Sequence, residues 1–194
     1  MPIVGIVPAA GRGARFAEAD PAAPPKMLAP IDGVPMVRRT VESLLRAGVE
    51  FCLVVVAPSG VKAIGQALGG LPVRLVTNPD PSRGMFSSVQ CALASARQED
   101  QCLLLPGDMP HVQSSTIAAV IAAGQGGKRT VTPLLAGHRG HPVLCSSVLR
   151  DRIVAAPIDS RLDHLLDQDD VVGVDVTDPG VRRDVDHPGA PAHL

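Results

Sequence analysis

Hydrophobic and polar positions follow a regular block pattern along the first two thirds of the chain. Short uninterrupted apolar runs, typical of buried parallel strands, alternate with longer stretches whose apolar residues recur at helical spacing. Strands alternating with helices of this length are typical of βαβ units and a mostly parallel sheet. The pattern predicts strands at residues 3–7, 51–57, 73–77, 102–105 and 130–135, and helices at 34–47, 61–68, 87–96 and 114–123, the last with a serine cap.

The pattern weakens after residue 135. It predicts short strands at 143–145 and 171–176, a helix at 162–166, and a peripheral tail rich in proline and glycine. Near the other end, the stretch 16–25 is rich in proline and alanine and predicts a mobile loop over the turn that precedes it.

That turn follows the first strand and carries two glycines with interleaved arginines, Ala9-Ala10-Gly11-Arg12-Gly13-Ala14-Arg15. Glycines let backbone N–H groups approach a phosphate, and arginines bind phosphate oxygens through two parallel hydrogen bonds. Lys26 follows as one of only three lysines and would add charge. The alternative is an ordinary strand-to-helix turn whose basic side chains face water.

A dinucleotide-binding oxidoreductase on a similar fold is disfavoured by the same turn. The fingerprint G-x-G-x-x-G needs a third glycine, but Phe16 stands there. An acidic residue is expected after the second strand, where the chain has Ala57-Pro58-Ser59. The P-loop pattern is also absent from the sequence.

Several loops are predicted to meet at one edge of the sheet. The glycine turn, residues 78–88 and the turn at 106–110 all follow predicted strands, and open α/β sheets bind ligands at these carboxyl ends. Asp108 would lie in this cleft. A carboxylate beside a phosphate is repulsive unless a cation such as Mg²⁺ lies between them. Alternatively, Asp108 bonds its own turn.

Five further residues are candidates for the same site. Ser87 and Ser88 open a predicted helix, where they either cap it or contact a base or ribose. His141 precedes a proline and by itself indicates a turn. Asp184 and Asp186 alternate along an extended segment and therefore face the same side, unless the segment is an exposed tail.

Composition excludes several classes of function. The chain has 194 residues, of which 45% are hydrophobic, with 18 basic and 19 acidic side chains and 2% aromatics. It offers neither the basic field nor the stacking platforms of a nucleic-acid binder. No apolar run would span a membrane and no basic segment precedes the first one, so we expect a cytoplasmic protein without a signal peptide. Buried free thiols, rather than a metal site or disulfides, are expected at Cys52, Cys91, Cys102 and Cys145.

In combination, the motifs resemble the MobA-like nucleotidyltransferases, closest to the molybdenum-cofactor cytidylyltransferase branch. The resemblance extends from the first strand to Pro188 and preserves the family's order. It rests on the glycine turn, Lys26, Gly84-Met85-x-Ser87-Ser88, Gly107-Asp108-Met109-Pro110, Gly140-His141-Pro142-Val143 and Asp184-x-Asp186-x-Pro188.

The resemblance implies a single domain over residues 1–194 with a three-layer αβα, Rossmann-like fold of the nucleotide-diphospho-sugar transferase type. It implies Mg²⁺-dependent transfer of a nucleotidyl group from a nucleoside triphosphate, with CTP favoured, to a phosphorylated acceptor, first of all molybdopterin. Each implied role falls on a matching position: triphosphate binding on Ala10, Gly11, Arg12, Gly13, Arg15 and Lys26; the nucleoside on Ser87 and Ser88; the metal on Asp108 and Asp186; and the acceptor on His141.

Two departures from the family pattern leave alternatives open. The long stretch 16–25 and Pro8 resemble the isoprenoid-pathway cytidylyltransferases instead. The final aspartate is followed by His187-Pro188-Gly189, where Thr-Pro and acidic residues are common. A phosphorylated alcohol or sugar therefore stays open as the acceptor, Asp184 stays open as the second metal ligand, and a non-catalytic nucleotide-binding protein stays open as a class.

Overall fold

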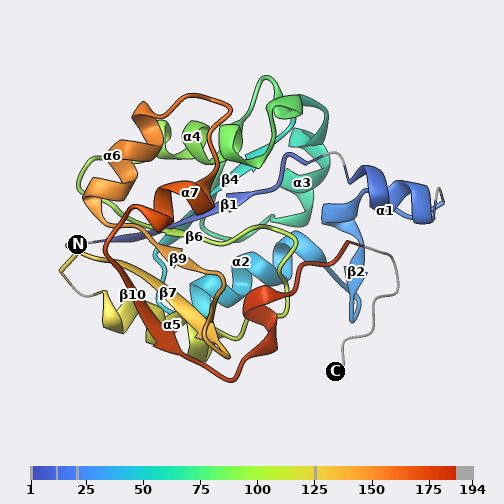
Figure 1. Cartoon of the computed structure of the whole chain (residues 1–194). Coiled ribbons are helices and arrows are strands. Elements are labelled where there is room, and N and C mark those ends of the chain that lie inside the picture. The colour runs from blue at the N-terminus through green and yellow to red at the C-terminus, as the bar shows by residue number, and fades with distance from the viewer. Residues whose placement is uncertain (1, 12, 21, 125, 187–194) are drawn as a thin grey trace.

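The main sheet has eight strands in the order β10-β7-β9-β6-β1-β4-β5, with β8 paired to β7. We describe a computed structural model at residues 2–11, 13–20, 22–124 and 126–186 (Figure 1). The strands are β1 (Ile3–Pro8), β4 (Phe51–Val56), β5 (Val73–Thr77), β6 (Gln101–Leu104), β7 (Thr130–Leu135), β8 (His138–Arg139), β9 (Val143–Leu144) and β10 (Val171–Asp175), and a separate hairpin pairs β2 (Pro30–Ile31) with β3 (Val34–Pro35).

Most of the sheet is parallel. β1 lies between β4 and β6 and is parallel to both, β4 is parallel to β5, and β10 is parallel to β7. The short β9 runs antiparallel between β6 and β7, and β8 is antiparallel to β7. This mixed, mostly parallel sheet confirms the predicted α/β class.

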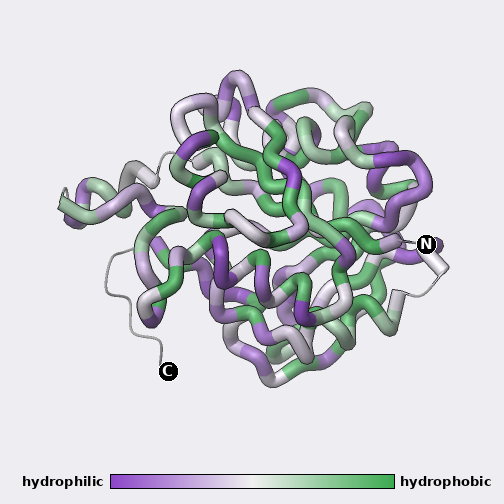
Figure 2. Tube along the Cα trace, turned by 180° about the vertical axis from the view of Figure 1, so that it is seen from behind, coloured by the Kyte–Doolittle hydropathy of each residue, from purple (hydrophilic) through white to green (hydrophobic). Residues whose placement is uncertain are grey.

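Helices cover both faces of the sheet and make a three-layer structure (Figure 1). Successive residues of β1 point to opposite faces, so Val7 packs on one layer and Val4 and Ile6 on the other. One layer holds α2 (Met36–Arg46), α3 (Val61–Ala67) and α5 (Ser114–Ala123), and the other holds α4 (Met85–Ser95), α6 (Ser147–Ala155) and α7 (Leu162–Asp167). The most hydrophobic stretches lie in the strands between these layers (Figure 2).

Several element boundaries differ from those predicted. α2 begins at Met36 because residues 30–35 form the β2–β3 hairpin, and α4 begins at Met85 rather than at the serines. α6 was not predicted from the pattern. α5 has the predicted bounds but no serine cap: Gln113 is at the N-cap position and makes no side-chain cap, and its backbone N–H donates to Asp178 Oδ2 at 2.8 Å.

The prediction of a loop at 16–25 is wrong in its first part. Ala14–Ala19 forms the helix α1, and Phe16 is only 3% exposed, packed with Ala29, Met36 and Val185. The loop was predicted from the proline- and alanine-rich composition of the stretch, which does not reveal that Phe16 is buried. α1 projects from the body in both views (Figures 1 and 2).

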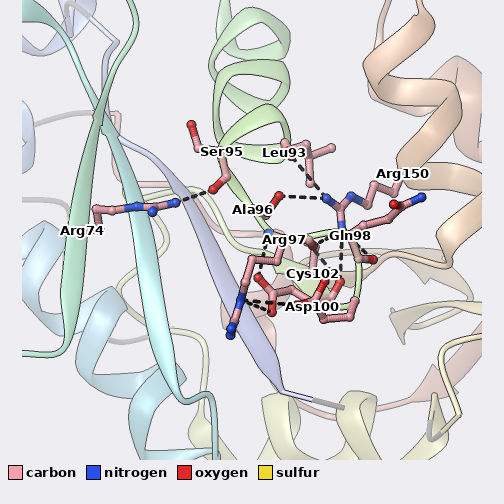
Figure 3. Close-up of polar contacts among 10 residues, drawn as sticks. Arg74, Leu93, Ser95, Ala96, Arg97, Gln98, Asp100, Cys102 and Arg150 are labelled. Carbon is pink, nitrogen blue, oxygen red and sulfur yellow. Dashed lines mark hydrogen bonds and ion pairs between the residues drawn. The ribbon is translucent and has the colours of Figure 1, made fainter.

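The far end of α4 is held by arginines. Arg150, from α6, donates to five backbone carbonyl oxygens at and beyond the C-terminus of α4, at 2.6–3.4 Å, and Arg74 donates to Ser95 O (Figure 3). Carbonyls at a helix C-terminus lack intrahelical partners, so these cations satisfy them. α4 is thus anchored at the end opposite the sheet edge where its first residues lie.

Within the described residues, no helix is long and apolar enough to cross a membrane. The four cysteines are free; Cys52, Cys102 and Cys145 are buried as predicted, whereas Cys91 is only partly buried. Burial raises the pKa of the Cys52 thiol to about 12 and that of Cys102 to about 11, so both are protonated at neutral pH.

Candidate active site

Asp108 lies at the carboxyl end of β6, next to the end of β1. The backbone N–H of Gly107 donates to Pro8 O at 3.0 Å and so joins the two strand ends. Thr40 Oγ1 on α2 donates to Gly107 O at 3.1 Å. A Cβ at Gly107 would lie 3.1 Å from Pro8 O, so the smallest residue allows this close packing. The turn therefore places the Asp108 carboxylate at the sheet edge, as the pattern predicted.

Lys26 bridges two of the candidate carboxylates. Its Nζ donates to Asp108 Oδ2 and to Asp186 Oδ1, both at 2.7 Å, and its side chain is only 9% exposed. Burial lowers the pKa of Lys26, but the hydrogen bonds and charges of Asp108 and Asp186 outweigh burial and raise it above its usual value. Lys26 is therefore a permanent cation at this site.

Asp184 belongs to the same cluster. Carboxylate oxygens of Asp108, Asp184 and Asp186 all lie within 4.8 Å of one another. The backbone N–H of Val185 donates to Asp108 O at 2.9 Å, which fixes this C-terminal segment beside the β6 turn. The alternation of the two aspartates does place both on one side, and the segment is not a free tail.

The glycine turn lies against Lys26. Gly13 has φ +59°, and a Cβ there would lie 2.8 Å from Lys26 Cβ. Gly11 has open space around it, and Ala10 is buried beside it. Arg12 is outside the described residues, and Arg15 is described only as backbone of α1.

Ser87 and Ser88 lie in the first turn of α4, and both are buried. Asn78 Nδ2 donates to Ser87 Oγ at 2.9 Å and to Ser88 Oγ at 3.0 Å, while Ser87 Oγ donates to Gly84 O at 2.7 Å. The hydroxyl proton of Ser87 is therefore used in a hydrogen bond at the N-terminus of α4. Asn78 was not singled out in the sequence, although an asparagine directly after a strand is a common turn residue.

His141 lies on the turn before β9. Its backbone N–H donates to Val181 O at 2.8 Å, and its buried Nε2 has no partner among the described residues. Burial lowers the pKa of His141 to about 4, although the charge of Asp108 opposes the shift. The imidazole is therefore neutral at pH 7.

Three cavities adjoin along this edge, and each shares lining residues with the next. The glycine-turn cavity, of about 150 Å³, is lined by Ala10, Gly11, Gly84, Ser88 and Asp108 among others. The aspartate cavity, of about 280 Å³, is lined by Asp108, Asp184, Arg139, His141 and Arg182 among others. The arginine cavity, of about 770 Å³, is lined by Arg83, Arg139, Arg161, His141, Phe86 and Leu166 among others.

These cavities bring the glycine turn, the aspartates and His141 into one continuous site. Met85, the first residue of α4, lines all three cavities, and Arg139 lines two. Met85 belongs to a motif noted in the sequence but had no role assigned to it, and Arg139 was not identified from the sequence. The signal for Arg139 was present, because it directly precedes the Gly-His-Pro turn.

Curated relatives are similar to this chain over about two thirds of its length. A 2-C-methyl-D-erythritol 4-phosphate cytidylyltransferase of Nocardia farcinica is 32% identical over 137 residues, or 69% of this chain and 56% of the relative. The bifunctional protein GlmU of Alkalilimnicola ehrlichii is 35% identical over 125 residues, or 63% of this chain and 25% of the relative. The chain thus spans between a quarter and just over half the length of these relatives.

Solved structures share the fold over almost the whole chain. A nucleotidyl transferase from Methanothermobacter thermautotroptrophicus has a TM-score of 0.78 at 26% identity, covering 95% of this chain and 92% of its own. Rv0371c from Mycobacterium tuberculosis H37Rv has a TM-score of 0.81 at 24% identity, covering 96% and 94%, which shows the fold alone.

The match that decides the family is to the MobA-like NTP transferase domain, over residues 5–172. It includes the glycine turn, Lys26, Asp108 and the turn at His141. The chain therefore belongs to the MobA-like NTP transferase family, a family of nucleotidyltransferases.

Proposed function

We propose that the protein transfers a nucleotidyl group, with CTP as the favoured donor, from a nucleoside triphosphate to a small phosphorylated acceptor and releases pyrophosphate. The observation that carries this proposal is the cluster of Lys26, Asp108 and Asp186, where one cation lies 2.7 Å from each carboxylate. The cluster lies between a glycine turn suited to phosphates and a large cavity suited to a second substrate.

The carboxylates fit a magnesium ion. Their oxygens lie within 4.8 Å of one another, and Mg²⁺ prefers carboxylates together with substrate phosphates. In this proposal Asp108 and Asp186 hold the ion, with Asp184 as the alternative to Asp186. When bound, the ion would neutralise charge on the triphosphate.

The remaining work falls on side chains of this chain. The acceptor phosphate is already an anion and attacks the α-phosphorus directly, so no strong general base is required. Lys26, Arg15 and the backbone of the glycine turn hold the triphosphate so that the acceptor oxygen attacks in line with the departing pyrophosphate. Catalysis then comes from alignment and charge neutralisation. Neutral His141 lies toward the acceptor and does not add a charge.

Lys26 changes partners in this scheme. In the free protein it neutralises Asp108 and Asp186. When nucleotide and cation bind together, Lys26 exchanges these carboxylates for phosphate oxygens. The lysine thus prevents three neighbouring carboxylates from repelling one another before substrate arrives.

Different observations support two classes of acceptor. A phosphorylated alcohol or sugar is supported by relatives named as 2-C-methyl-D-erythritol 4-phosphate cytidylyltransferases. Molybdopterin, implied by the resemblance of the motifs, is supported by the apolar part of the large cavity, where Phe86, Val89, Val143, Leu162 and Leu166 line the wall.

A turnover screen tests this proposal. CTP, GTP, ATP and UTP are each incubated with Mg²⁺ and with either 2-C-methyl-D-erythritol 4-phosphate or molybdopterin, and pyrophosphate release is measured. We expect release with one acceptor and fastest release with CTP. Binding of nucleotide without pyrophosphate from any pair would indicate a non-catalytic nucleotide-binding protein. A shift in melting temperature with nicotinamide cofactors would instead support an oxidoreductase function.

A further inference from the structure

We propose that Arg139 is the residue that binds the acceptor's phosphate. This inference rests on the proposed function and adds to it a side chain that the motifs did not identify. The acceptor phosphate must come close to Asp108 and its two neighbouring carboxylates. In the proposed function Lys26 and the metal ion bind the triphosphate, so a further cation is needed on the acceptor side of the site.

Arg139 lies at the junction of the two cavities that an acceptor would occupy. It lines the aspartate cavity together with Asp108 and Asp184, and it also lines the larger arginine cavity. Of the arginines around these two cavities, Arg139 alone lines both. A phosphate bound there can face the reacting centre while the rest of the acceptor fills the larger cavity.

The backbone around Arg139 is held on two sides. Arg139 pairs with Leu134 in the β7–β8 hairpin, and the next residue, Gly140, donates its N–H to Pro133 O at 2.9 Å. On the other side Gly140 packs so closely on Val181 that a Cβ would lie 2.5 Å from Val181 O. A rigid hairpin thus carries the guanidinium, which suits precise placement of a substrate group.

The present partner of Arg139 is easily exchanged. Arg139 Nη1 donates to Asp167 Oδ1 at 2.9 Å, with side chains that are 43% and 66% exposed. Exposed ion pairs contribute little to stability. A phosphate can bind the planar guanidinium through two parallel hydrogen bonds and therefore competes well with Asp167. Asp167 acts as a placeholder for the acceptor phosphate.

The competing explanation is that the Arg139–Asp167 pair merely ties α7 to the hairpin. The two explanations predict opposite effects of Asp167→Asn. Loss of a placeholder frees Arg139 and strengthens phosphate binding, whereas loss of a structural tie leaves binding unchanged or weakens it.

The test uses phenyl phosphate as the simplest phosphate monoester with an apolar body. Its affinity for the 194-residue chain is measured by calorimetry with Mg²⁺, in the presence and absence of the non-cleavable analogue α,β-methylene-CTP. We expect Arg139→Gln to weaken binding about tenfold, Arg139→Lys to weaken it less, and Asp167→Asn to strengthen it about twofold.

Arg129 supplies the matched control. Arg129 directly precedes β7, at the end of the strand opposite the β7–β8 hairpin. It forms an exposed ion pair with Asp170, at 3.3 Å, and lines none of the three cavities. Arg129→Gln should leave phenyl phosphate binding unchanged. Absence of saturable binding to the wild type, equal affinity of Arg139→Gln and wild type, or weaker binding by Asp167→Asn would overturn the inference. Failure of the CTP analogue to bind would instead contradict the proposed function.

Discussion

Lys26 Nζ lies 2.7 Å from Asp108 Oδ2, so a cation of the chain already neutralises the carboxylate at the end of β6. The same ammonium group lies 2.7 Å from Asp186 Oδ1. The position between the two carboxylates is therefore shared between Lys26 and any divalent cation that binds them. Metal and nucleotide should consequently bind as coupled ligands.

Lys26→Met should strengthen metal binding by the free protein while weakening nucleotide binding. Without the ammonium group, the carboxylates lose their counter-ion and attract a divalent cation on the order of tenfold more tightly. Titration with Mn²⁺, followed by electron paramagnetic resonance, measures this directly. Lys62→Met, at an exposed position on α3, is the matched control and should change neither affinity. Unchanged Mn²⁺ affinity in Lys26→Met would contradict the exchange of partners.

Gly13→Ala should weaken nucleotide binding by displacing Lys26. The new Cβ would lie 2.8 Å from Lys26 Cβ, and its left-handed backbone would cost a further 1–2 kcal/mol or so. Gly70→Ala isolates the backbone cost, because Gly70 has φ +81° and no neighbour within 4 Å of its Cβ position. We expect both variants to lose stability, but only Gly13→Ala to lose affinity in a thermal-shift titration with CTP. Equal affinities would show that the turn does not position Lys26.

The position of the site was largely predictable, because it follows from the topology of the sheet. Parallel strands bring the ends of β1 and β6 together, and an apolar run followed by Gly107-Asp108 is enough to place that carboxylate. Alternation likewise placed Asp184 and Asp186 on one side. What was not predictable was Lys26 between the aspartates, since Lys26 begins a short 3-10 helix outside the sheet, whose position the strand order does not determine.

The errors in the fold have a common physical cause. Tertiary packing overrode local composition where one buried side chain decided the structure. Phe16 anchors α1 in a stretch that otherwise has the composition of a loop. At the start of α5, Gln113 is at the N-cap position in place of a serine, and its backbone N–H donates to Asp178, which is distant in sequence. α6 was not predicted because its buried face consists of only two residues, Leu149 and Ile153, which give a weak helical pattern.

Protonation of His141 should destabilise the protein in mild acid. Its pKa is about 4 in the fold against 6.5 for an ordinary histidine, so the unfolded state binds the proton first. The stability from neutral His141 is therefore present above pH 6.5 or so and is lost as the pH falls toward about 4, amounting to at most about 3 kcal/mol. Urea unfolding of wild type and His141→Asn across this range measures the difference. His164→Asn, at an exposed position on α7, should retain the wild-type pH dependence.

Arg150→Gln should lower stability without altering nucleotide affinity per folded molecule. It removes the charge that satisfies five carbonyl oxygens around the end of α4, and we expect a loss of about 2 kcal/mol in the free energy of unfolding. Arg152→Gln, on the same helix, removes exposed contacts to Gln168 only and should cost less than about 0.5 kcal/mol. Equal urea midpoints for the two variants would show that the Arg150 contacts contribute nothing measurable.

The proposed chemistry depends most directly on Asp108. Asp108→Asn preserves the size of a side chain that lies at the edge of the cleft, so the fold should persist while metal and Lys26 lose a charged partner. Asp151→Asn, at an exposed position on α6, is the matched control.

The measurement is Mg²⁺-dependent pyrophosphate release from CTP with the acceptor found in the turnover screen, made on wild type and both variants under the same conditions. Asp108→Asn should lower the rate by about two orders of magnitude or more, with an unchanged melting profile, while Asp151→Asn should retain the wild-type rate. Wild-type turnover by Asp108→Asn would contradict the assignment of this carboxylate cluster as the catalytic centre.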